Sequence, residues 1–313
     1  MIIALLVPLV LPWALAPLAH RTVERVRPEI ALWAVTCASA VLAVGVMASL
    51  GVLLLPLILA VPWLAALADL IQPLQAGPQL PVLTASALAA GTLAVTGFGV
   101  LRKTVSEMAR LRAVHGRVAD LPDTGELCVL DDLRPDAFAL PGGPGRADRI
   151  VVTTGMLRAL EPVEREALLA HERAHLAARH HLFLSAAHLA GWCHPALASV
   201  TGQVSFAAER AADEAAARRL GDRAVTARAV GRAALAVSRV RGSATAPASA
   251  PGAASGPVSA RVRALLGQSP VRRVVPALLA MALLCTAAGA SSLAGAVWLH
   301  RSVEVAQGEH PSE

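Results

Sequence analysis

Hydrophobic residues gather in four long runs without charge. The run at 2–19 is just long enough to cross about 30 Å of hydrocarbon. Its positive charges follow the run instead of preceding it, which favours a transmembrane helix over a signal peptide. Three further runs lie at about 30–55, 82–101 and 274–299. The pattern predicts three transmembrane helices within residues 1–101 and a fourth at 274–299.

Basic residues are distributed unevenly around these runs. Segment 20–28 holds three arginines, 56–81 holds no basic residue, and 102–117 holds five. Basic residues near span ends favour the cytoplasmic side. Four spans with the N-terminus outside satisfy all three observations, whereas a hairpin within 30–68 would place 102–117 outside. We therefore expect a multi-pass protein of the cell membrane, with 102–273 in the cytoplasm and a short extracytoplasmic tail at 300–313.

The composition agrees with contact to lipid. Hydrophobic residues make up 55% of the 313 residues and charged residues 16%, against about 25% charged in an average soluble domain. Segment 102–273 carries 24 basic and 16 acidic residues. Aromatic residues are only 3%, so this basic excess favours an anionic membrane surface over direct nucleic-acid binding. The predicted spans lack charged residues, which argues against transport.

The region between the third and fourth runs has mixed periodicity. Short apolar or alternating stretches at 126–131, 136–140 and 149–154 predict strands, with PGGPG (141–145) as the turn between the last two. The rest is mostly helical, so we expect an α+β domain over 102–241. An Ala/Pro/Gly/Ser-rich linker at 242–260 and a basic juxtamembrane segment at 261–273 follow it.

The stretch HERAH (171–175) lies in a predicted helix. A proline and three acids at 161–166 mark the N-terminus, and the helix is expected to run to about His181. His171 and His175 are one turn apart, so both imidazoles can reach one zinc ion, while Glu172 is placed to take a proton from water. The alternative is a His-rich helix without metal, because His180, His181, His188 and His194 are nearby.

A second helical stretch, at 205–220, offers a third ligand. Catalytic zinc commonly takes two histidines and a glutamate. Glu209 can complete this set, and Asp213, one turn on, can accept a proton from the other nitrogen of a zinc-bound histidine. The alternative is that both acids are solvated. If Glu209 is a ligand, the uncharged segment 182–200 must return to the same side, as a core or membrane-embedded helix.

In combination, DAFALPGG, RIVVTTGML, EREALLAHERAH and ERAADEAAAR resemble the gluzincin membrane peptidases, over about residues 130–221. The resemblance is greatest to the BlaR/MecR antibiotic-sensor group, and the HtpX-type proteases are more distant. It implies a gluzincin-like (minimal zincin) domain at 102–241. His171, His175 and Glu209 would be zinc ligands, Glu172 the general base and Asp213 a supporting residue.

Three departures bear on the comparison of the two groups. HtpX-type relatives usually carry Ser-Arg ahead of the third ligand, where this chain has Ser205-Phe206, and often Asn where this chain has Asp136. These first two departures favour the sensor group over the HtpX-type proteases. The penicillin-binding domain that follows the last span of antibiotic sensors is absent, so direct β-lactam sensing is not expected. RIVVTT is the candidate edge strand that would pair with a substrate backbone, although a plain structural hairpin fits equally.

We therefore expect a membrane zinc endopeptidase that hydrolyses peptide bonds in a cytoplasmic protein substrate. The resemblance implies a BlaI/MecI-like repressor, or the chain itself, as that substrate. Two alternatives stay open: an HtpX-like quality-control protease and a non-catalytic signalling scaffold. The expected partners are a protein or peptide substrate and membrane lipid, and a homo-oligomer is left open.

Overall fold

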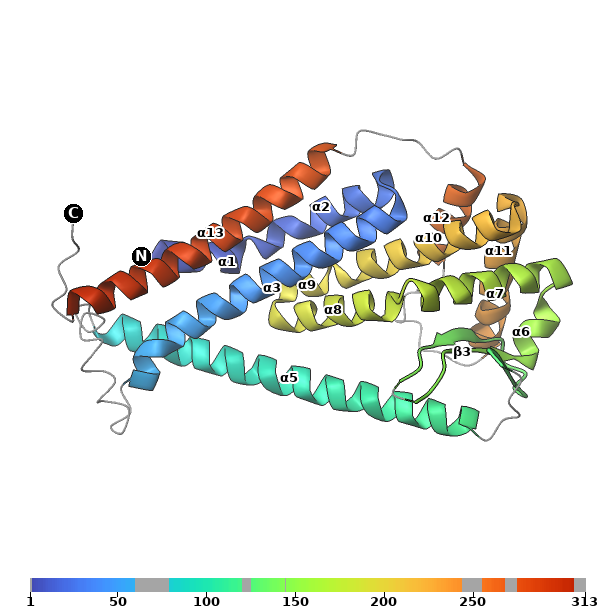
Figure 1. Ribbon diagram of the computed structural model, residues 1–313, viewed down its shortest axis with the longest axis horizontal. Helices are drawn as coiled ribbons and strands as arrows, with labels where there is room; N and C mark the ends of the chain where they lie inside the picture. Colours follow the sequence, from blue (N-terminus) through green and yellow to red (C-terminus); the bar gives the residue numbers. More distant parts are fainter. Residues whose placement is uncertain are drawn as a thin grey trace.

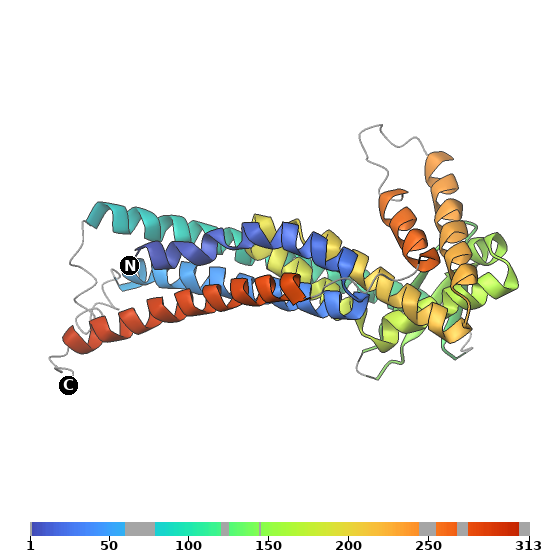
Figure 2. The same ribbon diagram turned by 90° about the horizontal axis from the view of Figure 1, so that it is seen from above.

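The computed structural model describes residues 2–59, 79–119, 125–143, 145–243, 255–267 and 275–306. The described chain is mostly helical and contains a three-stranded sheet. Figures 1 and 2 show a long bundle at one end and the sheet with its surrounding helices at the other.

The first apolar run forms two helices, α1 (Ile2–Val10) and α2 (Pro12–Arg25). Leu11 between them keeps helical angles (φ −54°, ψ −34°). Pro12 lacks the N–H that would continue the hydrogen-bond ladder, so the segment predicted as one helix at 2–19 is divided here. Neither α1 nor α2 has the roughly 20 residues that a crossing needs, and a crossing by 2–19 stays a prediction.

Three long helices match the other predicted spans: α3 (Pro28–Leu59), α5 (Gln79–Ala119) and α13 (Val275–Ala306). Within the described residues, the segments long and apolar enough to cross a membrane are Pro28–Leu55, Thr84–Gly116 and Pro276–Gly295. Helix α5 extends beyond the predicted end at 101, because the following Arg and Lys are good helix formers and no proline interrupts them.

The bundle also includes segments from the middle of the chain. Helices α8 (His180–Cys193) and α9 (Pro195–Ala198) run away from the sheet, and α10 (Thr201–Leu220) returns beside them and α3 (Figure 1). Their apolar residues join those of α2 and α3 in one buried core, which includes Leu15, Val35, Leu42, Leu197 and Val204. The uncharged segment 182–200 therefore turns back, as the proposed role of Glu209 requires.

The sheet has the strand order β1 (Leu127–Leu130), β3 (Arg149–Thr153), β2 (Ala137–Leu140). Strand β3 pairs with β1 in parallel and with β2 antiparallel. The expectation that RIVVTT is an edge strand is wrong, because both of its sides are hydrogen bonded. Strand β2 is instead the edge strand that packs against helix α7 (Pro162–Ala177).

Two further boundaries differ from the sequence expectations. Helix α7 ends at Ala177 and not near His181, because Arg179 adopts a left-handed conformation (φ 50°, ψ 43°) before α8 begins. Helix α12 (Ser255–Leu266) spans the predicted junction between linker and juxtamembrane segment. Its Leu265 is buried against Ala217 of α10 and Ala227 of α11 (Arg223–Ser243), which holds α12 on the domain. The part of the predicted linker at 244–254 lies outside the described residues.

Candidate metal centre

Helix α7 has a well-defined N-terminus that sets the register of HERAH. It begins at Pro162, whose missing N–H costs nothing in the first turn. The backbone N–H of Glu161 donates to the Glu164 carboxylate at 3.0 Å. Arg232 of α11 contacts both acids, at 2.6 Å and 3.0 Å. These contacts fix the start of α7, and the helical period then places His171 and His175 on one face.

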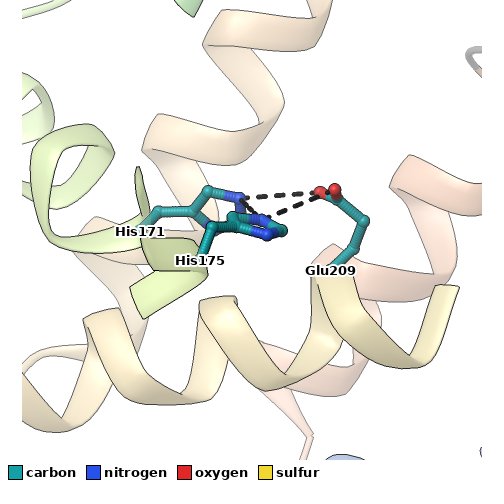
Figure 3. Close-up of side chains that lie close together, drawn as sticks. All are labelled: His171, His175 and Glu209. Atoms are coloured by element: carbon teal, nitrogen blue, oxygen red, sulfur yellow. Dashed lines mark hydrogen bonds and ion pairs between the residues drawn. The ribbon is translucent and has the colours of Figure 1, made fainter. Parts of the chain in front are cut away.

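Three side chains converge from α7 and α10 (Figure 3). Nε2 of His171 and Nε2 of His175 lie 3.1 Å apart. The carboxylate of Glu209 is 3.5 Å from Nε2 of His171 and 3.6 Å from Nε2 of His175. The structure thus brings together the three residues that the sequence singled out as metal ligands.

The spacing of these donor atoms suits zinc. With zinc–ligand bonds of about 2.0–2.2 Å, a tetrahedral site places neighbouring donor atoms roughly 3.3–3.6 Å apart. The separations of 3.5 and 3.6 Å lie within this range, and the separation of 3.1 Å between the two histidine nitrogens is slightly shorter. Two imidazoles and one carboxylate leave a fourth position for water or substrate, as in catalytic zinc sites.

Each histidine has a partner at its other ring nitrogen. Oδ1 of Asp213 lies 3.0 Å from Nδ1 of His171, so the aspartate stands where it was expected. Nδ1 of His180 lies 3.0 Å from Nδ1 of His175. Both partners are buried. A carboxylate placed as Asp213 is can fix which nitrogen of its histidine faces a metal.

Arg261 of α12 enters the centre from outside the two motifs. Its guanidinium donates to both carboxylate oxygens of Asp213 at 2.7 Å and lies 2.7 Å from Oε2 of Glu209. The sequence analysis missed this residue. It follows Asp213 by 48 positions and lies in a segment interpreted as linker and juxtamembrane chain, so spacing gave no signal for it.

Charges around His171 shift the pKa values of the three proposed ligands. Burial alone would lower its pKa, but hydrogen bonds and charge from Asp213 and Glu209 outweigh burial and raise the pKa to about 10. Burial and the neighbouring His171 charge lower the pKa of His175 to about 3. Burial opposes ionisation of Glu209, yet His171 and Arg261 lower its pKa to about 2. His171 is therefore the most basic of the three proposed ligands.

Glu172 lies beside this cluster and is 7% exposed. Burial raises the pKa of its carboxyl, while the His171 charge opposes that rise. A carboxylate with a raised pKa is better suited to accept and return a proton near neutral pH. The position and environment of Glu172 therefore agree with a general base.

A cavity of about 270 Å³ opens next to the centre. His171, Glu172, Glu209 and Arg261 are among the residues that line it. Its remaining wall is mostly apolar and comes from β2, α6 (Thr154–Ala159), α7, α11 and α12. It includes Ala137, Met156, Leu168, Val230 and Val237. The cavity can therefore hold an apolar side chain beside the metal position.

The other histidines near HERAH have local roles in the structure. Nδ1 of His188 contacts the backbone oxygen of Leu184 at 2.7 Å. Nδ1 of His194 accepts from the backbone N–H of Ala196 at the start of α9. Asp136, which opens the DAFALPGG motif, lines the cavity. Among the described residues, the cluster of side chains that could hold a metal ion consists of His171, His175 and Glu209.

Comparison with known proteins points to the same region. Residues 98–239, which hold the sheet and all of α7–α10, match the model of peptidase family M48. Protease HtpX homolog 1 from Streptomyces coelicolor is 41% identical over 73 residues, which are 23% of this chain and 24% of that protein. The chain thus spans about a quarter of that relative's length in the match. No solved structure matches the chain. The matched region contains the cluster of His171, His175 and Glu209 found by geometry.

Proposed function

We propose that this protein is an integral membrane, zinc-dependent endopeptidase that hydrolyses peptide bonds of a cytoplasmic protein substrate. One observation carries the proposal. His171, His175 and Glu209 present three donor atoms at zinc-like spacing, with Glu172 on the same turn of α7 and a cavity alongside. The match of residues 98–239 to peptidase family M48 supports it.

The roles of the residues follow from where they lie. His171, His175 and Glu209 would hold zinc, which supplies a Lewis acid that polarises the scissile carbonyl and activates water. Glu172 accepts the proton of the attacking water and returns it to the leaving amine. Asp213, whose Oδ1 lies 3.0 Å from Nδ1 of His171, pairs with that nitrogen and so keeps Nε2 directed to the metal position. Arg261 holds Asp213 through two hydrogen bonds.

The substrate backbone would add to the edge of β2 that faces away from β3. Strand β2 is at the sheet edge beside α7, and its Ala137 lines the cavity. An extended peptide paired there would place a side chain in the cavity and a peptide bond near Glu172, by β-augmentation. An edge strand next to the catalytic helix thus supports a protein or peptide substrate.

The proposal for the substrate class rests on the comparison with known proteins. The similarity to a protein named Protease HtpX homolog 1 supports a quality-control role in the membrane. Cleavage of a BlaI/MecI-like repressor, or of the chain itself, stays a prediction. A purified repressor of that type, incubated with the enzyme in lipid nanodiscs, would test it by the appearance of two fragments.

The test of catalysis is the substitution Glu172→Gln. It keeps the shape of the side chain and removes its proton-accepting oxygen, so cleavage of an unfolded protein such as casein should fall at least about 100-fold. Zinc content should be unchanged, because Glu172 is not a proposed ligand. Glu166→Gln, on the exposed side of α7, is the matched control and should cleave as the wild type does. Full activity in the Glu172 variant would exclude this mechanism, and no activity in a zinc-loaded wild type would favour a non-catalytic scaffold.

A further inference from the structure

Beyond the three proposed ligands, His180 is the side chain whose position the proposed function leaves unexplained. It is the first residue of α8 and is 2% exposed. Its Nδ1 lies 3.0 Å from Nδ1 of His175, and the two rings meet edge to face with centroids 4.7 Å apart. His180 therefore touches the nitrogen of His175 that faces away from the metal position.

This contact depends on the break between α7 and α8. On a continuous helix, residues five apart point about 140° away from each other, so His180 would turn away from His175. Arg179 prevents this by adopting φ 50°, and it is the non-glycine residue with positive φ in the described chain. Residues other than glycine rarely adopt this backbone conformation, and such outliers concentrate at functional sites. The break redirects the chain so that the ring of His180 meets His175.

Packing behind His180 holds its ring in place. The Phe183 ring packs edge-on against His180, with centroids 6.5 Å apart. Phe183 in turn packs against Trp33 of α3, at 4.7 Å between centroids. A column of rings thus runs from a candidate membrane span to the neighbour of a proposed zinc ligand.

We propose that His180 is a positioning residue for His175, as Asp213 is for His171. The role rests on the proposed zinc centre. When Nε2 of His175 faces the metal position, its Nδ1 carries the proton and donates to Nδ1 of His180. This hydrogen bond fixes both the tautomer and the ring orientation of His175. Each histidine ligand then has its own buried acceptor: a carboxylate for His171 and an imidazole for His175.

The test compares two substitutions of similar size in the full-length protein in nanodiscs. Asn at position 180 keeps an acceptor near the place of Nδ1, whereas Leu removes it and preserves apolar packing. Zinc affinity is measured by competition with a chromophoric chelator, and the cobalt-substituted proteins give absorption spectra of the ligand field. We expect His180→Leu to raise the zinc Kd about 10–100-fold, the usual effect of losing such a partner, and to shift the cobalt bands. His180→Asn should stay within about threefold of the wild type.

The adjacent residue supplies the control. His181 is partly exposed and its substitution by Leu should leave the zinc Kd unchanged. Equal Kd values and spectra for His180→Leu and His180→Asn would overturn the positioning role, since packing alone would then explain the residue. Tight zinc binding in the wild type together with unchanged binding in His180→Leu would overturn only the role of His180. Absence of zinc binding in the wild type would overturn the proposed zinc centre itself.

Discussion

At the scale of single residues, the centre contains buried charges that stabilise one another by pairing. Arg261 is 13% exposed in its side chain and lies between the carboxylates of Asp213 and Glu209. His171 is buried between the same two acids. Removing one cation leaves a buried carboxylate without its partner, which costs far more than an exposed ion pair contributes.

Arg261→Ala should therefore destabilise the metal-free protein. We expect the free energy of unfolding to fall by about 3–5 kcal/mol, and saturating zinc should recover part of this loss by neutralising Glu209. Thermal melting with and without zinc measures both effects. Arg263→Ala, on the exposed side of the same helix, should melt as the wild type does. Equal melting of the two variants would show that the Arg261 contacts contribute little.

The pH dependence of zinc binding follows from the pKa values of the two histidines. His171 has a pKa of about 10 in the metal-free protein because Asp213 and Glu209 outweigh burial, whereas burial lowers the pKa of His175 to about 3. Between about pH 6 and 8 zinc must therefore displace one proton, from His171. The apparent Kd should fall about tenfold per pH unit in this range. A Kd independent of pH, or one that changes a hundredfold per unit, would contradict this assignment.

The raised pKa of His171 also predicts how the stability of the metal-free protein changes with pH. The pKa of His171 is raised above its ordinary value of 6.5. Its contribution to stability is therefore fully present below about pH 6.5 and is lost as the pH rises toward about 10. Melting temperatures of the metal-free protein measured between pH 6.5 and 10 should decline, and Asp213→Asn should flatten the decline.

At the scale of elements, some features follow from the sequence and others do not. HERAH lies on a helix whose period brings His171 and His175 together, and the i, i+4 spacing of Glu209 and Asp213 on α10 does the same for the acids. Arg179 gave no such signal, because arginine is a good helix former and no glycine or proline marks the break. The order of the strands was also hidden, since β3 is apolar whether it is central or at the edge. Arg261 reaches the centre through the packing of α12, which no local pattern encodes.

The end of α10 offers a test of how firmly the ligand helix is held. Gly221 follows its last residue with φ 72°, a conformation that costs an L-residue about 1–2 kcal/mol. Gly221→Ala should therefore lower the free energy of unfolding by about that amount. Gly231, within α11, has open space around its Cα, and Gly231→Ala should raise stability by about 0.5–1 kcal/mol. Melting midpoints that move in the same direction for both variants would contradict the assigned conformations.

At the scale of the whole molecule, the centre and the bundle are joined through α10. Arg210 of α10 donates to the backbone oxygen of Val23, and Arg218 pairs with Glu29 at 3.2 Å. The start of α1 and the end of α13 lie at the end of the molecule far from α7 (Figures 1 and 2). If the candidate spans cross a bilayer, the centre stands on the side opposite those two helix ends. That this side is the cytoplasm stays a prediction.

This topology predicts which positions are accessible in intact cells. In a variant whose four cysteines are replaced by alanine, a cysteine at position 222, between α10 and α11, should react with a membrane-impermeant maleimide only after permeabilisation. A cysteine within 60–78, which the arginine distribution places outside, should react in intact cells. The reverse pattern would contradict the orientation with the N-terminus outside.

The central claim, a zinc centre formed by α7 and α10, is tested most directly by the zinc content of the purified protein. Elemental analysis should find close to one zinc per chain in the wild type and in the control Glu166→Ala. Glu209→Ala, which removes the ligand contributed by α10, should lose most of the metal. Negligible zinc in the wild type that added metal does not restore, or unchanged zinc in Glu209→Ala, would contradict the account.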